Sequence, residues 1–153
     1  MINLVYYSPE LRVHRDGSIE RYYKTKKEWK KVNNKPNLKG YLMINIDYED
    51  IRISRLISFC YLGLCSLKHT IEEIDHIDRN RINNKVDNLR IVSHQHNLWN
   101  KEYKGYCYRP TRNKFLSRIA VNGKQINIGY FKTEEEAREA YLTAKVKYHI
   151  IAT

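Results

Sequence analysis

The sequence has few cysteines, few acidic residues and no long apolar run. Its three cysteines, Cys60, Cys65 and Cys107, are an odd number and include no Cys-x-x-Cys pair. We therefore expect neither a disulfide framework nor a zinc knuckle, and we interpret these residues as reduced thiols. No stretch approaches the apolar length that spans a bilayer, and the N-terminus has no charged region followed by a long apolar run. These absences predict a soluble, intracellular protein with no membrane partner.

Positive charge is the dominant feature of the composition. The 153 residues include 28 Lys and Arg against 17 Asp and Glu, a formal net charge of +11. Such a surplus is typical of a surface that binds phosphate, although a basic ribosomal or membrane-surface protein would share it. The 13 tyrosines interleaved with the basic residues favour a folded polar surface over a disordered basic tail. Composition therefore favours a nucleic-acid partner without identifying one.

Residue types used in catalysis gather in the middle of the sequence. Residues 74–77 can form a short strand, and residues 89–92 are a short apolar return strand after an Asn-rich loop. Ser93 then has the side chain of an N-cap, so a helix is expected to start there. This order of strand, loop, strand and helix would bring the side chains of Asp75, His76 and Asn97 close together.

Metal-assisted cleavage of a phosphodiester is the chemistry that suits these side chains. Asp75 and Asn97 offer hard oxygen ligands, which Mg²⁺ or Mn²⁺ prefers, and most of an octahedral shell stays open to water and phosphate oxygens. His76 follows a ligand along a strand and so points to the opposite side, where a neutral imidazole can take the proton of an attacking water. His94 and His96 are expected to point away from the Asn97 face of the helix.

These residues belong to a longer pattern: Asp75-His76-Ile77-Asp78, Asn80, Asn83-Asn84, Asn88-Leu89-Arg90 and Asn97. The pattern closely resembles the ββα-metal motif of HNH endonucleases, in the His-Asn-Asn form common among phage and intron-encoded homing endonucleases. The resemblance implies Asp75 and Asn97 as metal ligands and His76 as general base. It implies Asn88 as the central asparagine that holds the loop between the strands. Arg79 stands where a glycine is usual.

A β-rich region with a short helix is expected before this motif, over residues 1–66. Asp16-Gly17 is a hairpin signal, and residues 40–47 alternate as a strand that pairs back with residues 51–53. Ser54 is expected to cap the short helix, which supports the catalytic hairpin. A basic segment in this region offers either phosphate contacts or a solvated face through Lys26, Lys27, Lys30 and Lys31.

A separate C-terminal module is expected over residues 105–153, after a linker at residues 101–104. Asn122-Gly123 is a hairpin turn between two strands, and a capping box opens the helix that follows. Gly129-Tyr130-Phe131-x-Thr133 and Glu135-Glu136-Ala137-x-x-Ala140-Tyr141 resemble the AP2 DNA-binding domain, whose sheet enters the major groove. The resemblance implies DNA contacts from Arg109, Arg112, Lys114, Arg118 and Lys124.

Together these features predict an α+β protein whose nuclease motif, over residues 67–100, lies between the N-terminal region and the AP2-like module. We expect a metal-dependent HNH DNA endonuclease that uses one Mg²⁺ or Mn²⁺ ion and nicks or cuts double-stranded DNA at preferred sites, as a monomer or dimer. If phage-encoded, it would act in the host cytoplasm. Arg79 and Arg81, in the loop of the motif, are further candidates for DNA contact. The alternatives are a DNA-binding regulator with an inactive nuclease motif and a basic RNA-binding protein.

Overall fold

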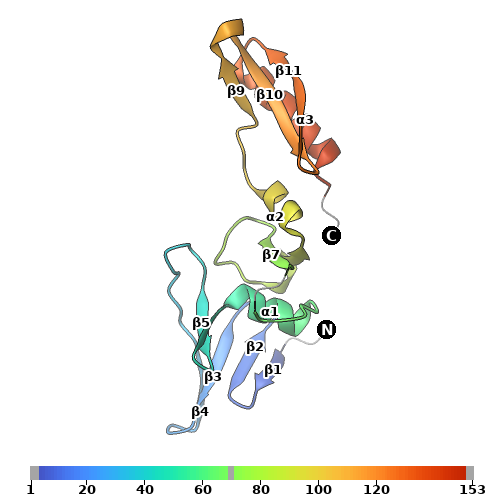
Figure 1. Cartoon of the computed structure of the whole chain (residues 1–153). Helices are drawn as coiled ribbons and strands as arrows, with labels where there is room; N and C mark the ends of the chain where they lie inside the picture. The colour runs from blue at the N-terminus through green and yellow to red at the C-terminus, as the bar shows by residue number, and fades with distance from the viewer. Residues whose placement is uncertain (1–3, 69–70, 151–153) are drawn as a thin grey trace. The chain divides into compact units, whose positions relative to one another are not determined.

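The computed structural model describes residues 4–68 and 71–150 (Figure 1). The chain divides into two compact units, Met1–Asn100 and Lys101–Thr153, and the boundary lies where the predicted linker begins. The described residues form four sheets and three α-helices, which confirms the predicted α+β class. Within residues 4–68 and 71–150, no helix is long and apolar enough to cross a membrane.

The first sheet of unit 1 has four strands in sequence order, β1 Leu4–Ser8, β2 Leu11–His14, β3 Ile19–Tyr23 and β4 Glu28–Lys31. The predicted Asp16-Gly17 turn joins β2 to β3, and Asp16 Oδ1 accepts the backbone N–H of Ser18 at 2.8 Å. Strand β4 was not predicted, because the basic residues of this segment suggested a solvated face. It forms because Trp29 lies opposite Tyr22, with ring centroids 5.3 Å apart, and such aromatic pairs stabilise antiparallel strands.

A second hairpin, β5 Met43–Ile46 and β6 Glu49–Arg52, leads directly into helix α1 Ile53–Tyr61. Ser54 does not cap α1, so that expectation was wrong. The helix begins one residue earlier, at Ile53, and its N-cap Arg52 makes no capping hydrogen bond through its side chain. Ser54 is buried within the first turn instead, where its side chain cannot act as the cap.

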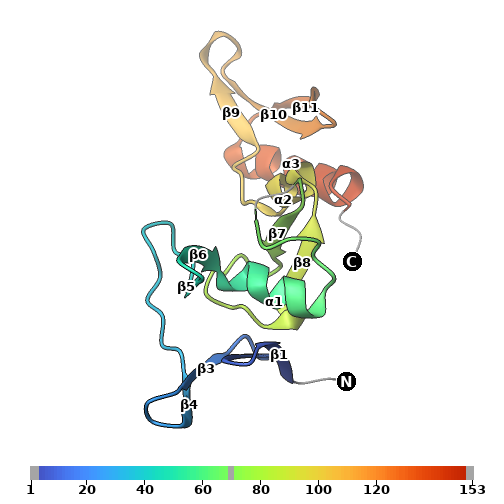
Figure 2. The same cartoon turned by 60° about the horizontal axis from the view of Figure 1, so that its bottom comes forward.

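The segment that holds Asp75, His76 and Asn97 forms the predicted hairpin and helix. Strand β7 Glu73–His76 pairs antiparallel with β8 Leu89–Val92, and helix α2 His94–Asn100 follows. Ser93 caps α2 as expected, since its Oγ accepts the backbone N–H of His96 at 3.3 Å. Figures 1 and 2 both show the hairpin between α1 and α2.

One hydrophobic core holds unit 1 together. Its buried members come from the first sheet, the second hairpin, α1 and the motif: Leu11, Val13, Ile19, Ile44, Ile53, Leu56, Ile57, Val86 and Leu89. Residues 1–66 and 67–100 therefore contribute to the same interior. Because the motif shares this core, its strands are held by packing that the short β7–β8 hairpin could not supply alone.

Unit 2 is a three-stranded sheet in the order β11-β10-β9, packed on a helix. Its elements are β9 Tyr106–Arg109, β10 Lys114–Val121, β11 Lys124–Phe131 and α3 Glu134–Tyr148. The Asn122-Gly123 turn has φ of 51° and 74°, and both bonds of the predicted capping box between Thr133 and Glu136 are present. Gly105, at φ 79°, enters β9 so close to Tyr141 that an added Cβ would lie 2.1 Å from the ring.

Candidate active site and basic surfaces

Arg55 positions the start of β7. This residue of α1 is only 6% exposed, and its guanidinium donates to backbone carbonyls along the segment that leads into β7. Two of these contacts, from Nη2 to the carbonyls of Ser66 and Lys68, are 2.7 Å long. A third, from Nη1 to the carbonyl of Glu72, is 3.3 Å long. Arg55 thus has a structural role, because its donors are used by the backbone that leads to the motif.

Asp75 faces β8 and α2. It is 5% exposed and lies opposite Arg90 in the hairpin. Its Oδ2 accepts hydrogen bonds from Arg90 Nε at 2.9 Å and Nη2 at 2.7 Å. Its Oδ1 accepts one from Asn100 Nδ2 at 2.9 Å. These three hydrogen bonds fix the orientation of the carboxylate.

His76 faces the loop between β7 and β8, on the other side of the strand. Its ring is 5% exposed, and Nε2 lies 3.1 Å from Oδ1 of the buried Asn84. The ring of Tyr41 lies beside it, with centroids 6.1 Å apart. The alternation of a strand therefore separates the carboxylate from the imidazole, as the sequence predicts.

The side chains of α2 that face β7 are spaced three residues apart. His94 Nδ1 lies 2.6 Å from the carboxylate of Glu73, and Asn97 Nδ2 donates to the same carboxylate. Asn100 lies one turn further on, against Asp75. The expectation that His94 points away from the Asn97 face was wrong, because residues at i and i+3 share a helix face. The structure thus places Asn97 beside Glu73 and Asn100 beside Asp75.

Oxygen atoms at this face suit a hard cation. Asn97 uses its amide nitrogen on Glu73, and its Oδ1 has no hydrogen-bond partner among the described residues. The Asp75 carboxylate supplies a charged oxygen of the kind that Mg²⁺ and Mn²⁺ bind. The described residues contain no group of three or more His, Cys, Asp and Glu side chains arranged to hold a metal. The predicted ligand pair of Asp75 and Asn97 therefore stays a prediction.

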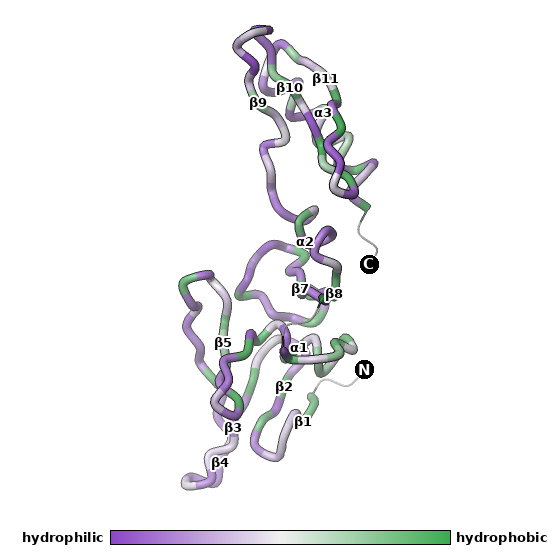
Figure 3. The backbone as a smooth tube through the Cα atoms, in the orientation of Figure 1, coloured by the Kyte–Doolittle hydropathy of each residue, from purple (hydrophilic) through white to green (hydrophobic). Residues whose placement is uncertain are grey.

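Asn88 holds the loop between the strands. Its Nδ2 donates to Asp78 Oδ1 at 2.9 Å and to the carbonyl of Asn83 at 2.8 Å, and its Oδ1 accepts the N–H of Asp78. Desolvation opposes ionisation of Asp78, but hydrogen bonds from Asn83, the Asn80 N–H and Asn88 outweigh it and lower the pKa of this carboxyl. Figure 3 shows that this loop is mostly hydrophilic, so these polar contacts order it in place of apolar packing.

Arg79 adopts the backbone that glycine would supply. Its φ is 65°, in the left-handed region, and its N–H donates to the carbonyl of His76 at 2.8 Å. The turn after β7 therefore survives the replacement of the usual glycine. Arg81 is engaged within the protein, since its Nη1 donates to the carbonyl of Lys39 at 2.6 Å and its Cζ lies 4.9 Å from the ring centroid of Tyr41.

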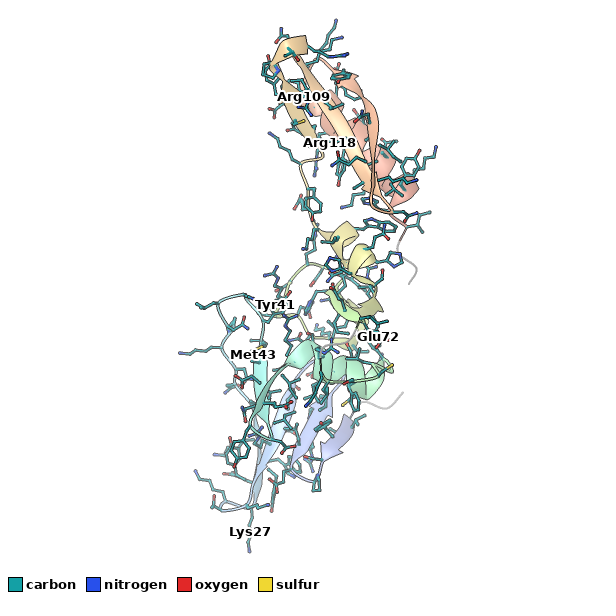
Figure 4. All side chains as sticks on the ribbon, in the orientation of Figure 1. Lys27, Tyr41, Met43, Glu72, Arg109 and Arg118 are labelled. Atoms are coloured by element: carbon teal, nitrogen blue, oxygen red, sulfur yellow. The ribbon has the colours of Figure 1, made fainter. Side chains whose placement is uncertain are left out.

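The four basic residues of the first sheet lie away from the motif, on or next to β4. Lys27 is at the outer end of the β3–β4 hairpin, where its φ is 52° (Figure 4). Lys26 is exposed in the same turn, and Lys31 is exposed on the strand. Lys30 forms an ion pair with Glu28 at 3.1 Å. These lysines form a solvent-exposed basic edge, which is compatible with either of the two predicted roles.

In unit 2, strand pairing puts most of the predicted basic residues on one face of the sheet. Lys114 pairs with Arg109, and Arg118 follows at an even spacing on β10 (Figure 4). Arg112 stacks on Tyr130, which pairs with Leu116 on the same side. Ile119 packs toward α3, so these basic residues take the opposite face. Lys124 does not join them, because it pairs with Val121 on the α3 side.

The cysteines are free thiols. Burial raises the pKa of the Cys60 thiol to about 11, so this group is protonated at neutral pH and is a poor nucleophile. Cys65 is exposed, and its hydrogen bond with Glu72 also raises the pKa of its thiol. Neither thiol is activated as a nucleophile.

A protein-family model described as HNH endonuclease matches residues 71–98, which hold Asp75, His76, Asn88 and Asn97. This segment is thus similar to HNH endonucleases. The protein described as "Uncharacterized HNH endonuclease L560" of Acanthamoeba polyphaga mimivirus is 34% identical over 71 residues, or 44% of this chain and 38% of that relative. The chain thus spans well under half of the relative's length. A solved structure described as "DNA binding and cleavage by the HNH homing endonuclease I-HmuI" aligns with 92% of this chain and 82% of its own, at 18% identity and a TM-score of 0.48.

Sequence reasoning assigned no role to several residues of the candidate site. Arg90, Asn84 and Asn100 contact the two predicted catalytic side chains directly. Arg90 could have been found from the hairpin register, which sets it opposite Asp75. Asn100 had a weaker signal, its spacing of three residues from Asn97 on the helix. Glu73 is two residues from Asp75 on a strand and so shares its face.

Proposed function

We propose that this protein is a metal-dependent DNA endonuclease that hydrolyses phosphodiester bonds of double-stranded DNA at preferred sites. One observation carries the proposal: within the matched HNH segment, β7 holds a buried carboxylate and a buried imidazole on opposite sides, each fixed by hydrogen bonds. Metal-assisted hydrolysis of a phosphodiester uses both groups, a ligand for a cation and a base for water.

Different residues of the site are assigned different roles in this reaction. Asp75 and Asn97 would hold one divalent ion, Mg²⁺ or Mn²⁺. When bound, such an ion neutralises charge on the phosphate and on the departing 3′ oxygen. Arg90 orients Asp75, and His76 accepts the proton of the attacking water. Asn88 keeps the loop after β7 in one conformation.

DNA binding is proposed for the basic faces. The face of the unit 2 sheet that carries Arg109, Lys114 and Arg118 is suited to an AP2-like contact with the major groove. The β4 edge and Arg79 would add phosphate contacts, which carry affinity but little sequence information. One HNH site per chain would cut one strand at a time, so a second event or a dimer is needed for a double-strand break. If the protein is virus-encoded, as its mimivirus relative is, it would act inside the host cell.

Arg118→Ala is expected to weaken DNA binding several-fold. It should also reduce the slope of log K against log salt by about 0.9, because one phosphate contact releases about one counterion. Fluorescence anisotropy with a labelled duplex at several salt concentrations measures both. Lys147→Ala is the matched control, because it removes the same charge from α3. A salt slope that falls equally in both variants would refute the proposed sheet contact.

Conversion of supercoiled plasmid to open-circle or linear DNA tests the proposed function. We expect conversion with Mg²⁺ or Mn²⁺ and none after a chelator is added. Salt-sensitive DNA binding without cutting, on plasmids that carry varied target sequences, would support the DNA-binding regulator instead. Metal-independent binding to RNA without cleavage of DNA would support the RNA-binding alternative.

A further inference from the structure

Asn84 is buried, although it belongs to the polar loop between β7 and β8. It is 4% exposed, and its Oδ1 lies 3.1 Å from His76 Nε2. Its Nδ2 lies 3.5 Å from the carbonyl oxygen of Ile82. Exchanging the two amide atoms would put Oδ1 against that carbonyl oxygen, where two acceptors repel. The network therefore sets Oδ1 as the atom that faces the imidazole.

This arrangement selects one tautomer of His76. An amide oxygen can only accept a hydrogen bond, so Nε2 must be the donor and carries the proton of the neutral ring. Nδ1 is then the nitrogen with a lone pair, and it has no hydrogen-bond partner among the described residues. We propose that Asn84 is a positioning residue that holds His76 in the Nε2–H tautomer and thereby assigns Nδ1 as the base. The role of Nδ1 rests on the proposed function, whereas the tautomer does not.

The first sheet packs against the loop segment that holds Asn84. Gly17, in the β2–β3 turn, lies so close that an added Cβ would be 2.7 Å from both the carbonyl carbon and oxygen of Asn84. Next to it, the carbonyl of Arg15 accepts the N–H of Val86 at 3.0 Å, and Arg15 Nη2 donates to Asp87 at 2.9 Å. These contacts with the first sheet therefore fix the position of the loop. Because Asn84 belongs to this loop, they also fix the orientation of the His76 imidazole.

Asn84→Leu, which keeps the branched shape and the number of side-chain heavy atoms but removes the acceptor, tests the proposal. We expect kcat for plasmid nicking to fall about 10- to 100-fold, as is typical when a supporting partner is lost, while the Kd for DNA changes less than about twofold. Asn84→Asp keeps the acceptor toward Nε2 but replaces the donor to the Ile82 carbonyl by a second acceptor, so it should restore the turnover only in part. Nicking by Asn84→Leu at the wild-type rate would overturn the role of Asn84.

Nitrogen chemical shifts report the tautomer without any cutting. Two-bond ¹H–¹⁵N correlation spectra of the full chain, at a pH where the imidazole is neutral, should show Nε2 protonated in wild type and Asn84→Asp. Asn84→Leu should show a mixture. A wild-type ring protonated on Nδ1 overturns the inference. If wild type cuts no DNA but its ring is protonated on Nε2, the proposed function fails and the tautomer assignment stands.

Gly17→Ala and Gly63→Ala separate support of the loop from backbone strain. Both glycines have positive φ, 86° and 78°, but a Cβ on Gly63 meets nothing within 4 Å. We expect Gly17→Ala to lose about tenfold in kcat and to shift the His76 ring resonances, and Gly63→Ala to do neither. Equal losses, or equal resonance shifts, would overturn the support by the first sheet.

Discussion

His76→Ala is expected to reduce the rate of DNA cutting by about 10²- to 10⁴-fold, the usual contribution of a general base. The loss follows from the chemistry, because water attacks phosphorus poorly unless its proton is removed. DNA affinity should stay near wild type, since the ring is buried beside Asn84 and Tyr41 and forms no ion pair with any residue in the described ranges. Single-turnover nicking of plasmid with Mg²⁺ measures the rate, and duplex anisotropy measures the affinity.

His14→Ala is the matched control for this variant. His14 lies in the first sheet, with its Nε2 3.0 Å from Glu20, so its loss removes a partly buried histidine without touching the HNH site. It should cut at close to the wild-type rate. Thermal melts of both variants identify any loss of folding. Equal cutting by wild type and His76→Ala would exclude His76 as the base.

Asp75→Ala is expected to abolish metal-dependent cutting and also to destabilise unit 1 by about 3 kcal/mol, the cost of breaking a buried ion pair at one partner. The destabilisation arises because Arg90, whose side chain is 16% exposed, would lose the carboxylate that neutralises it. Asn100 would lose an acceptor at the same time. Urea unfolding gives the change in free energy, and the plasmid assay gives the activity.

Asp75→Ala combined with Arg90→Leu separates the two effects. Replacing both partners of a buried ion pair by apolar residues is often close to neutral for stability, so the double variant should regain most of the unfolding free energy. It should still not cut DNA, because the carboxylate ligand is absent. Cutting restored in the double variant would mean that Asp75 acts only through folding, and would contradict its role at the metal.

The local features of the fold were predictable because each depends on a few adjacent residues. The turns at Asp16-Gly17 and Asn122-Gly123 and the capping box at Thr133 appear where the sequence predicts them. The order β7, β8 and α2 was predictable too, because its signals are short apolar runs and one N-cap residue. Strand β4 was not, since a basic strand forms only where a neighbouring strand offers a partner such as Tyr22 for Trp29.

The sequence by itself determined that an aspartate and a histidine leave β7 on opposite sides, since alternation is a property of any strand. Only the tertiary structure decided what each side chain meets. Arg90 and Asn100 reach Asp75 from 15 and 25 residues along the chain. The backbone of Asn84 lies close to Gly17, a contact that requires the first sheet to pack against the loop. Such contacts depend on how a shared hydrophobic core brings distant segments together, and no local pattern encodes that arrangement.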